Sequence, residues 1–352
     1  MISIPYAWTL KYYMPMTTLY VAMEDALLVA RERGGGWTTE HHLEDKTLEC
    51  LAVDPGHPER IYVGTEDQGV WRTADGGRSW TPAGKGIAWA EVTAVAVAPG
   101  ESGRPGTVYA GTEPSAVFRS TDGGDTWTEL KGLTGLPSAS TWSFPPRPET
   151  HHVRWIGVDP HDARHLHVAV EAGALVRSLD GGDTWLDRAP DGPYDTHTLA
   201  LHPRARGRLY SAAGDGYYES RDEGRSWENN ESGLRHTYLF GVAVDPADPE
   251  RVVVSAASGP SRAYAASSAA SFIYVRNGGG AWEPVRDGLP DPKGTTISFL
   301  ATGHEPHVIY AANNRGVFRS NDAGATWERL DLPWPERFVR QSVQGFVLGS
   351  GG

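Results

Sequence analysis

Short apolar runs alternate with turn residues along almost the whole chain of 352 residues. The stretch at 51–80 is representative. It has apolar runs at 51–53, 61–64 and 70–72, separated by a Pro- and Gly-bearing turn and by a short loop. Period-two alternation in runs of this length indicates β-strands, and Pro and Gly between them indicate tight turns. The pattern therefore predicts repeated units of four short antiparallel strands.

Each unit contains one turn motif that a tryptophan closes. The copies are Thr73–Trp80, Ser120–Trp127, Ser178–Trp185, Ser220–Trp227 and Ser320–Trp327, with eroded copies at Arg276–Trp282 and Arg31–Trp37. A repeat of this length is a supersecondary unit that must stack on its neighbours to bury its apolar face. Four-stranded units arranged about an axis are the blades of a β-propeller.

The two ends of the repeat pattern predict how the ring closes. Three strands of a unit follow Pro15, at 19–24, at 27–30 and from Trp37 onward, and the missing first strand is found at 342–348. Six complete units and this composite one predict a single all-β, seven-bladed propeller at 16–352. Residues 1–15 are expected to form an extension outside it.

Composition narrows the classes of function. The net charge of −12, with no basic stripe, argues against nucleic-acid binding and against docking on an anionic membrane. Cys50 is the sole cysteine, so no intramolecular disulfide can form. No apolar run reaches the length of a membrane span, and the first fifteen residues lack the features of a secretory signal. We therefore expect a cytoplasmic protein.

The turn motif resembles the Asp-box (BNR) repeat, Ser-x-Asp-x-Gly-x-Thr-Trp. This repeat is found in sialidases, xyloglucan-hydrolysing glycosidases, sortilin-type receptors and photosystem II assembly factors. The resemblance implies a propeller in which the motif carboxylates stabilise turns rather than catalyse. Unlike the six-bladed sialidases, the chain has no Arg-Ile-Pro motif, and it has one propeller where the xyloglucan-cleaving enzymes have two. In size it is similar to the photosystem assembly factors, which are single seven-bladed binding scaffolds.

Topology places the candidate site on one face of the ring. In a four-stranded meander, the motif turns lie at the same end as the turns between strands one and two. The opposite face therefore collects the loops between strands two and three and the starts of the innermost strands. The two longest insertions, at 131–150 and 256–271, fall on this second face. Long loops on a rigid scaffold commonly carry binding sites.

Polar residues recur in register on that face. The loops between strands two and three supply Glu24, Glu66, Glu113 and Glu171. The starts of the innermost strands supply two levels, one with Glu91, His152, Asp195 and Tyr238, and a deeper one with Glu49, Arg154 and His197. His151, His236, Trp142, Arg315 and Arg340 lie near the same rim. We expect a channel mouth with carboxylates on one side and His and Arg on the other.

Three chemistries fit these residue types. Two carboxylates can act as acid and base, or as acid and nucleophile, on a glycoside. Imidazoles with a carboxylate can hold a divalent metal, and arginines can clamp an anionic ligand such as a uronate or sialate. The catalytic candidates are His151, His152, Arg154, His197, Glu66 and Glu113. The candidate metal ligands are His152, His197 and His236, and those for substrate binding are Glu24, Glu49, Glu91, Glu171, Asp195, His236, Tyr238, Trp142, Arg315 and Arg340.

Two hypotheses follow. The first is a small-molecule or glycan site, in a hydrolase or lyase acting on a sugar or sugar acid, with a divalent metal as the one cofactor that the residues suggest. The second is a non-catalytic scaffold that binds or assembles a partner protein. The insertion that carries Trp142 and Phe144 discriminates between them, because a lid folds over the channel and a docking loop splays outward. We favour the small-molecule site because docking does not require polar residues to converge from several units.

Overall fold

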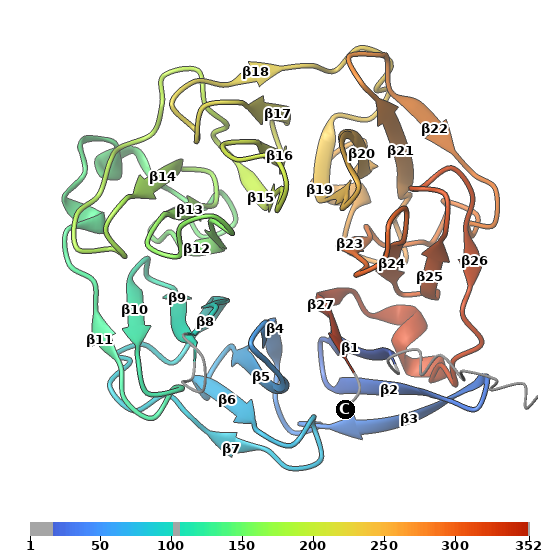
Figure 1. Cartoon of the computed structure of the whole chain (residues 1–352), viewed down its shortest axis with the longest axis horizontal. Coiled ribbons are helices and arrows are strands. Elements are labelled where there is room, and N and C mark those ends of the chain that lie inside the picture. The colour runs from blue at the N-terminus through green and yellow to red at the C-terminus, as the bar shows by residue number, and fades with distance from the viewer. Residues whose placement is uncertain (1–16, 101–105, 351–352) are drawn as a thin grey trace, which may run out of the picture.

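The computed structural model describes residues 17–100 and 106–350, and the extension expected at 1–15 lies outside them. The described residues form seven antiparallel sheets around one axis (Figure 1), which confirms the predicted seven-bladed propeller. We number the sheets as blades 1 to 7, and the innermost strand of each comes first below.

Blade 1 has the order β27 (Val343–Ser350), β1 (Thr17–Met23), β2 (Leu27–Arg33) and β3 (Gly36–His42). Blade 2 comprises β4 (Leu48–Asp54), β5 (His57–Thr65), β6 (Val70–Thr73) and β7 (Thr81–Pro82). Blade 3 comprises β8 (Val92–Ala98), β9 (Thr107–Thr112), β10 (Val117–Ser120) and β11 (Thr128–Glu129). Blade 4 has β12 (Val153–Val158), β13 (Leu166–Val170) and β14 (Ala174–Ser178).

Blade 5 comprises β15 (Thr196–Leu201), β16 (Leu209–Ala213), β17 (Gly216–Ser220) and β18 (Glu228–Asn229). Blade 6 comprises β19 (Tyr238–Asp245), β20 (Asp248–Ala257), β21 (Phe272–Asn277) and β22 (Glu283–Val285). Blade 7 comprises β23 (Phe299–Thr302), β24 (Ile309–Asn313), β25 (Gly316–Ser320) and β26 (Glu328–Arg329). Four short 3-10 helices lie in the connections: η1 (Leu133–Gly135), η2 (Pro137–Thr141), η3 (Pro260–Arg262) and η4 (Glu336–Arg340).

The core lies between the blades. The middle strands are buried on both faces, as all five residues of β13 and of β16 are, because each blade packs against two neighbours. The short outermost strands, such as β11 and β18, are exposed. This burial explains why the second strand of each unit is a nearly continuous apolar run, whereas the outer strands are polar.

Blade 4 departs from the four-stranded expectation. Its outer strand is reduced to a single bridge between Arg177 and Leu186. The next residue, Asp187, accepts hydrogen bonds from the backbone and the hydroxyl of Ser138 in the 131–150 insertion. The insertion thus ties down the segment that would otherwise continue the outer strand.

The polar residues that recur in the motif turns hold those turns together. In the turn that ends at Trp127, Asp122 Oδ1 accepts the Thr126 N–H at 2.9 Å, and Ser120 Oγ accepts the Gly124 N–H at 2.8 Å. Gly124 has φ of +91°, a conformation that favours glycine. The carboxylate therefore satisfies backbone donors, as expected, and Trp127 is buried between blades 2 and 3.

Each motif turn also docks on the preceding blade. A third-strand side chain reaches a turn carbonyl of the next blade in four successive cases, pairing Arg31 with Gly76, Arg72 with Gly123, Arg119 with Gly181 and Arg177 with Glu223. Between blades 5 and 6 the charges change sides. There the third strand supplies Glu219, and Arg276 of the eroded motif is its buried partner.

Strand β27 closes the ring by pairing antiparallel with β1 from Thr17 to Met23, as the composite blade predicts. Next to this pairing, Glu24 Oε1 accepts the N–H of Ser342 at 2.8 Å and its hydroxyl at 3.0 Å. Of the described helices, none has the length and apolar character needed to cross a membrane.

Candidate functional site

A β-bulge occurs at the start of six of the seven innermost strands in the described chain. The extra residues are Glu49, Thr93, Arg154, His197, Gln344 and, in β19, the pair Phe240–Gly241 opposite Ser255. Bulges interrupt a ladder and redirect a side chain, and they are common beside binding sites. The three residues that the sequence placed at the deeper level, Glu49, Arg154 and His197, are all bulge residues.

The bulged strands surround a central cavity of about 330 Å³. Residues from all seven innermost strands line it, and Arg154, Thr93 and Gln344 are among them. Most of the remaining lining is apolar, for example Val95, Ile156 and other strand residues. The charged side chains therefore gather at one end of the channel, where the innermost strands begin. We call this group the polar cluster, and its members include Glu113, His152, Arg154, Glu171 and His197.

The centre of the polar cluster is His152, which is 6% exposed. Its Nε2 lies 2.8 Å from Glu171 Oε2, and its Nδ1 lies 3.2 Å from Glu113 Oε2 without hydrogen-bond alignment. Arg154 Nε lies 3.4 Å from the same oxygen of Glu171. Two cationic groups therefore share Glu171 Oε2, and the second oxygen of this carboxylate, Oε1, is left for other partners.

The 131–150 insertion folds toward this cluster. Arg147 donates to Glu113 at 2.6 Å and to Glu91 at 3.0 Å, and the Phe144 ring packs edge-on against His152 at 4.7 Å between centroids. Its anchor on the outside of blade 4 is Ser138. The insertion thus runs from the outer wall to the channel mouth, and its tip covers His152.

His197 forms the inner wall of the cluster and is fully buried. Its Nδ1 lies 2.6 Å from the carbonyl oxygen of Leu239, which can only accept, so Nδ1 carries the proton. In the neutral ring, Nε2 then presents a lone pair. That atom lies 3.8 Å from Glu171 Oε1, 3.7 Å from Asp195 Oδ2 and 3.3 Å from the Tyr238 hydroxyl.

The second insertion, at 256–271, supplies the neighbouring wall. The Tyr264 hydroxyl lies 2.7 Å from the Tyr238 hydroxyl, and the Tyr264 ring packs edge-on against Phe240. Its backbone carbonyl accepts a hydrogen bond from Ser342. Both insertions therefore reach the mouth, one over His152 and the other beside His197.

The buried ion pairs separate the pKa values of the cluster. Burial favours the neutral ring of His152, but the nearby carboxylate of Glu113 and the hydrogen bond to Glu171 outweigh it and raise the pKa of His152 to about 9. Burial opposes ionisation of Glu171, yet the hydrogen bond from His152 and the adjacent positive charge lower its pKa to about 2. At neutral pH, His152 is therefore an imidazolium and Glu171 a carboxylate.

Two other carboxyl groups shift in the opposite direction. Burial raises the pKa of Glu49 to about 7; Arg154 opposes this rise, and the carboxylates of Glu91 and Glu66 add to it. Burial also raises the pKa of Asp195, and the charge of Glu171 adds to the effect. The mouth thus combines one strongly ionised carboxylate with others that hold a proton more easily than usual.

Several residues expected at the site lie elsewhere or have another role. Glu66 and Arg340 are exposed, and Glu24 is occupied by Ser342 in the ring closure. Arg315 lies in the loop before β25, where its backbone N–H donates to Asn313 and its carbonyl accepts from Arg329, and its guanidinium lies beside Gly294. The prediction from equal repeat positions is wrong for these residues. An equal position sets the height of a residue along the channel, whereas the local loop sets the direction of its side chain.

The three histidines expected to bind metal are not brought together. His236 stacks on Phe272 at 3.8 Å and bonds the Tyr274 hydroxyl at 2.6 Å, so it belongs to the outer part of blade 6. His152 is held between two carboxylates. Among the described residues, the group of side chains close enough to share an ion consists of Glu171, Asp195 and His197, with ligand atoms within 4.8 Å of one another.

His151 and Trp142 also have a packing role. Trp142 is 5% exposed, meets the His151 ring edge-on and fits against Gly173, where a Cβ would lie 2.9 Å from its ring. Burial lowers the pKa of His151, which favours the neutral form of this ring. The apolar part of the insertion is thus packed inward rather than presented to solvent.

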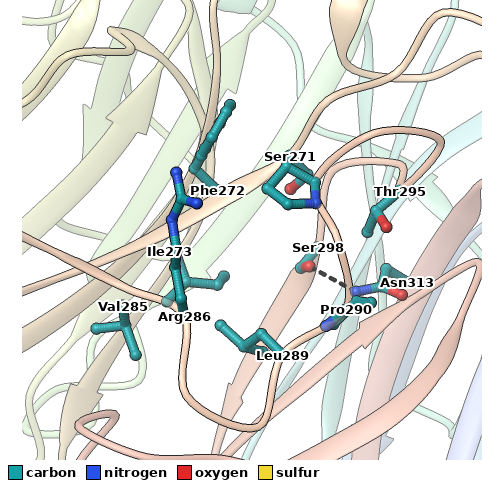
Figure 2. A pocket seen from close by; sticks show the side chains of 11 residues that line it. Ser271, Phe272, Ile273, Val285, Arg286, Leu289, Pro290, Thr295, Ser298 and Asn313 are labelled. Atoms are coloured by element: carbon teal, nitrogen blue, oxygen red, sulfur yellow. Dashed lines mark hydrogen bonds between the residues drawn. The ribbon is translucent and has the colours of Figure 1, made fainter.

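A second, smaller cavity lies beside blade 7, and Figure 2 shows its lining from Phe272 to Asn313. Its volume is about 20 Å³, roughly the space of one water. Arg286 is its one ionisable lining residue, and Ser298 and Asn313 already bond each other at 3.1 Å. It offers no cluster of reactive groups, so the channel mouth remains the candidate site.

Two contributors to the mouth were missed by the sequence reasoning, Arg147 and Tyr264. Both lie in insertions, which have no repeat register to read. The signals available were the Pro-Pro-Arg-Pro run at 145–148 and the single tyrosine in an Ala- and Ser-rich stretch at 256–271.

No family model matches the chain, and no curated protein matches it. Among solved structures it is similar to an ancestral GH74 enzyme, with a TM-score of 0.60 and 16% identity over 86% of this chain and 38% of that one. It is also similar to YCF48 bound to D1 peptide (TM-score 0.59, 16% identity, 87% and 94% covered). A third similar structure is the WD40 propeller domain of Doa1 (TM-score 0.58, 11% identity, 86% and 88%).

The chain spans little more than a third of the GH74 protein's length. At these identities the likeness shows the propeller fold alone. The similar structures include both an enzyme and a propeller with a bound peptide, so the fold comparison is compatible with catalysis and with protein binding.

Proposed function

We propose that the channel mouth binds a small, oxygen-rich ligand with a carboxylate group, of the sugar-acid class, and performs acid–base chemistry on it. The observation that carries the proposal is the convergence of buried and half-buried ionisable side chains from blades 2 to 6 at one end of the central cavity. Burying charge costs free energy unless the groups are paired, and such clusters are concentrated at functional sites.

Arg154 is the residue we assign to the ligand's carboxylate. Its Nε lies 3.4 Å from Glu171, its guanidinium lies over the Phe240 ring, and the residue is among those that line the cavity. The terminal nitrogens of this side chain donate no hydrogen bond to a described residue. A guanidinium presents two parallel N–H groups that match a carboxylate, so a sugar acid is favoured over a neutral sugar.

Glu49 and Glu171 suit two different chemical roles. With a pKa of about 7, Glu49 can both donate and accept a proton near neutral pH, which is what a general acid–base requires. Glu171, with a pKa of about 2, stays ionised and can stabilise positive charge or act as a nucleophile. A pair of carboxyl groups with separated pKa values supports a hydrolase or a lyase.

The alternative is a non-catalytic scaffold that binds a partner protein. It draws support from the similar structure that holds a peptide. Against it stands the 131–150 insertion, whose Trp142 is buried and whose Phe144 packs on His152 at the mouth. This inward position fits a lid better than a docking loop.

The experiment compares neutral sugars with their matching acids, for example glucose with glucuronate and galactose with galacturonate, by calorimetry and thermal shift. We expect binding of at least one acid and no binding of its neutral partner. Arg154→Gln should weaken that binding about tenfold or more, since a charge-assisted hydrogen bond contributes about 1.5–3 kcal/mol.

The matched control is Arg340→Gln, at an exposed position on the same face, which should leave affinity unchanged. Equal binding of acid and neutral sugars, or equal loss in both variants, contradicts the assignment of Arg154. Binding of a protein partner with no binding of any sugar acid would favour the scaffold instead.

A further inference from the structure

When the His197 ring is neutral, the cluster contains three acceptor atoms turned toward one another. Glu171 Oε1 and Asp195 Oδ2 lie 3.8 and 3.7 Å from His197 Nε2, and the three side chains' ligand atoms lie within 4.8 Å of one another. Lone pairs brought this close in a buried site repel each other unless a proton or a cation lies between them. The arrangement therefore calls for a positively charged occupant.

The side chains are fixed by their other contacts. The Leu239 carbonyl takes the Nδ1 proton of His197 at 2.6 Å, the Ala172 N–H binds Asp195 Oδ1 at 2.8 Å, and His152 holds Glu171 Oε2 at 2.8 Å. Each of the three groups thus has one end anchored and the other end directed at the common centre. Metal-binding histidines and carboxylates are typically oriented by such outer contacts.

We propose that Glu171, Asp195 and His197 form a binding site for one divalent transition-metal ion of the Zn²⁺ or Mn²⁺ type. An imidazole nitrogen with two carboxylate oxygens suits these ions better than Mg²⁺ or Ca²⁺, which prefer oxygen ligands alone. An ion about 2.1 Å from each ligand atom holds those atoms roughly 3.0–3.6 Å apart, so small side-chain movements close the site.

The Tyr238 hydroxyl does not block this site. It lies 3.3 Å from His197 Nε2 but only 2.7 Å from the Tyr264 hydroxyl, so it keeps a partner when an ion takes Nε2. With three protein ligands, the ion would retain open positions. These would face the mouth where Arg154 projects, so an anionic ligand could contact both.

Gly214 offers a test that removes no ligand atom. A Cβ at this position would lie 2.0 Å from Asp195 Oδ2, which is the free end of a side chain and can move. Gly214→Ala should therefore displace the carboxylate from the metal position while leaving the backbone of blade 5 in place.

The experiment uses the full-length protein without any sugar, so its outcome is independent of the proposed function. After chelation and dialysis, Zn²⁺, Mn²⁺ and Mg²⁺ are titrated by calorimetry, with elemental analysis of the loaded protein. We expect one Zn²⁺ or Mn²⁺ per chain and no stoichiometric Mg²⁺. Asp195→Asn and Gly214→Ala should each weaken binding at least tenfold, and Glu129→Gln, which changes an exposed carboxylate in the outermost strand β11, should not.

Thermal unfolding of each metal-free variant checks that it is folded. The proposal is overturned if the wild-type protein binds no stoichiometric transition metal, because a proton then fills the space. It is also overturned if both folded variants, Asp195→Asn and Gly214→Ala, bind the ion as tightly as the wild type does.

Discussion

The raised pKa of Glu49 makes the stability of the fold depend on pH. It sits at a bulge, largely buried, where Arg154 is the opposing charge and Glu91 a like one. Because its pKa is about 7 in the folded chain and near 4.5 in the unfolded chain, the folded state holds this proton more tightly. The fold therefore loses stability as the pH rises from about 4.5 to about 7, and the loss is complete above that range.

The prediction concerns Glu49→Gln, which cannot ionise. Below pH 4.5 the carboxyl group is neutral in both states, so variant and wild type should be equally stable. Between pH 4.5 and about 7 the wild type loses the stability that the raised pKa supplies, a loss on the order of 3 kcal/mol that the variant escapes. Urea unfolding at pH 4, 6 and 8 measures the difference.

Glu129→Gln serves as the control, because this carboxylate is exposed in the outermost strand β11. A stability gain in Glu49→Gln that is the same at every pH would show that the effect comes from packing and not from the charge.

The sequence predicts a residue of the mouth where that residue occupies the same position in several repeat units. Equal position in successive units identified Arg154 and His197, because a bulge recurs at the same place in six of the seven innermost strands. It identified Glu171 through the loop between the second and third strands. Comparison of the repeat units could not identify Arg147 or Tyr264, because both lie in insertions that have no counterpart in other blades. It also could not foresee that Glu24 would be used to hold Ser342.

At the scale of the structural element, the contact between a third strand and the next motif turn occurs in two electrostatic settings. Arg72 meets a partly exposed turn, and Asp125, its carboxylate partner, is 61% exposed. Glu219 and Arg276 make the reversed contact at 7% and 3% exposure, and Tyr217 lies against them. The eroded motif has thus lost its turn aspartate and gained a buried ion pair.

We predict unequal effects for neutralising these two carboxylates. Glu219→Gln leaves Arg276 buried without a full counter-charge and should cost roughly 3–5 kcal/mol of unfolding free energy. Asp125→Asn at the exposed contact should cost less than about 1 kcal/mol. Chemical denaturation of both variants at neutral pH gives the comparison, and equal costs would mean that burial does not set the strength of this contact.

The sequence predicted the elements better than their ends. Four strands per blade follow from alternation and turn residues, and the prediction holds in six blades. It is wrong in blade 4, because the segment after Leu186 bonds to Ser138 through Asp187 instead of extending a ladder. A long-range contact of this kind leaves no trace in local periodicity.

For the whole molecule, the decisive contact is the pairing of β1 with β27. Without β27, the backbone groups of β1 form an open sheet edge, and such edges pair with other chains. The inner face of blade 1 would also lose Phe346 and Leu348 from its core.

We therefore predict that deleting residues 343–352 abolishes the cooperative fold and yields assemblies larger than those of the full-length chain. Light scattering with size-exclusion chromatography and thermal unfolding would measure this change. Adding a synthetic peptide of residues 342–350 should restore the size of the full-length protein, because it supplies the missing strand. A truncated chain with an unchanged size and Tm would contradict this role of β27.

The composite blade has a consequence during synthesis. Glu24 and Ser342, which meet beside the closing strand, are 318 residues apart, so a ribosome needs roughly 15–60 s to make the chain between them. Over that time the first three strands to emerge lack their innermost partner, while six later blades can form beside them. Blade 1 is thus begun first and completed last, and the nascent chain needs protection at β1 for as long as translation of the other blades takes.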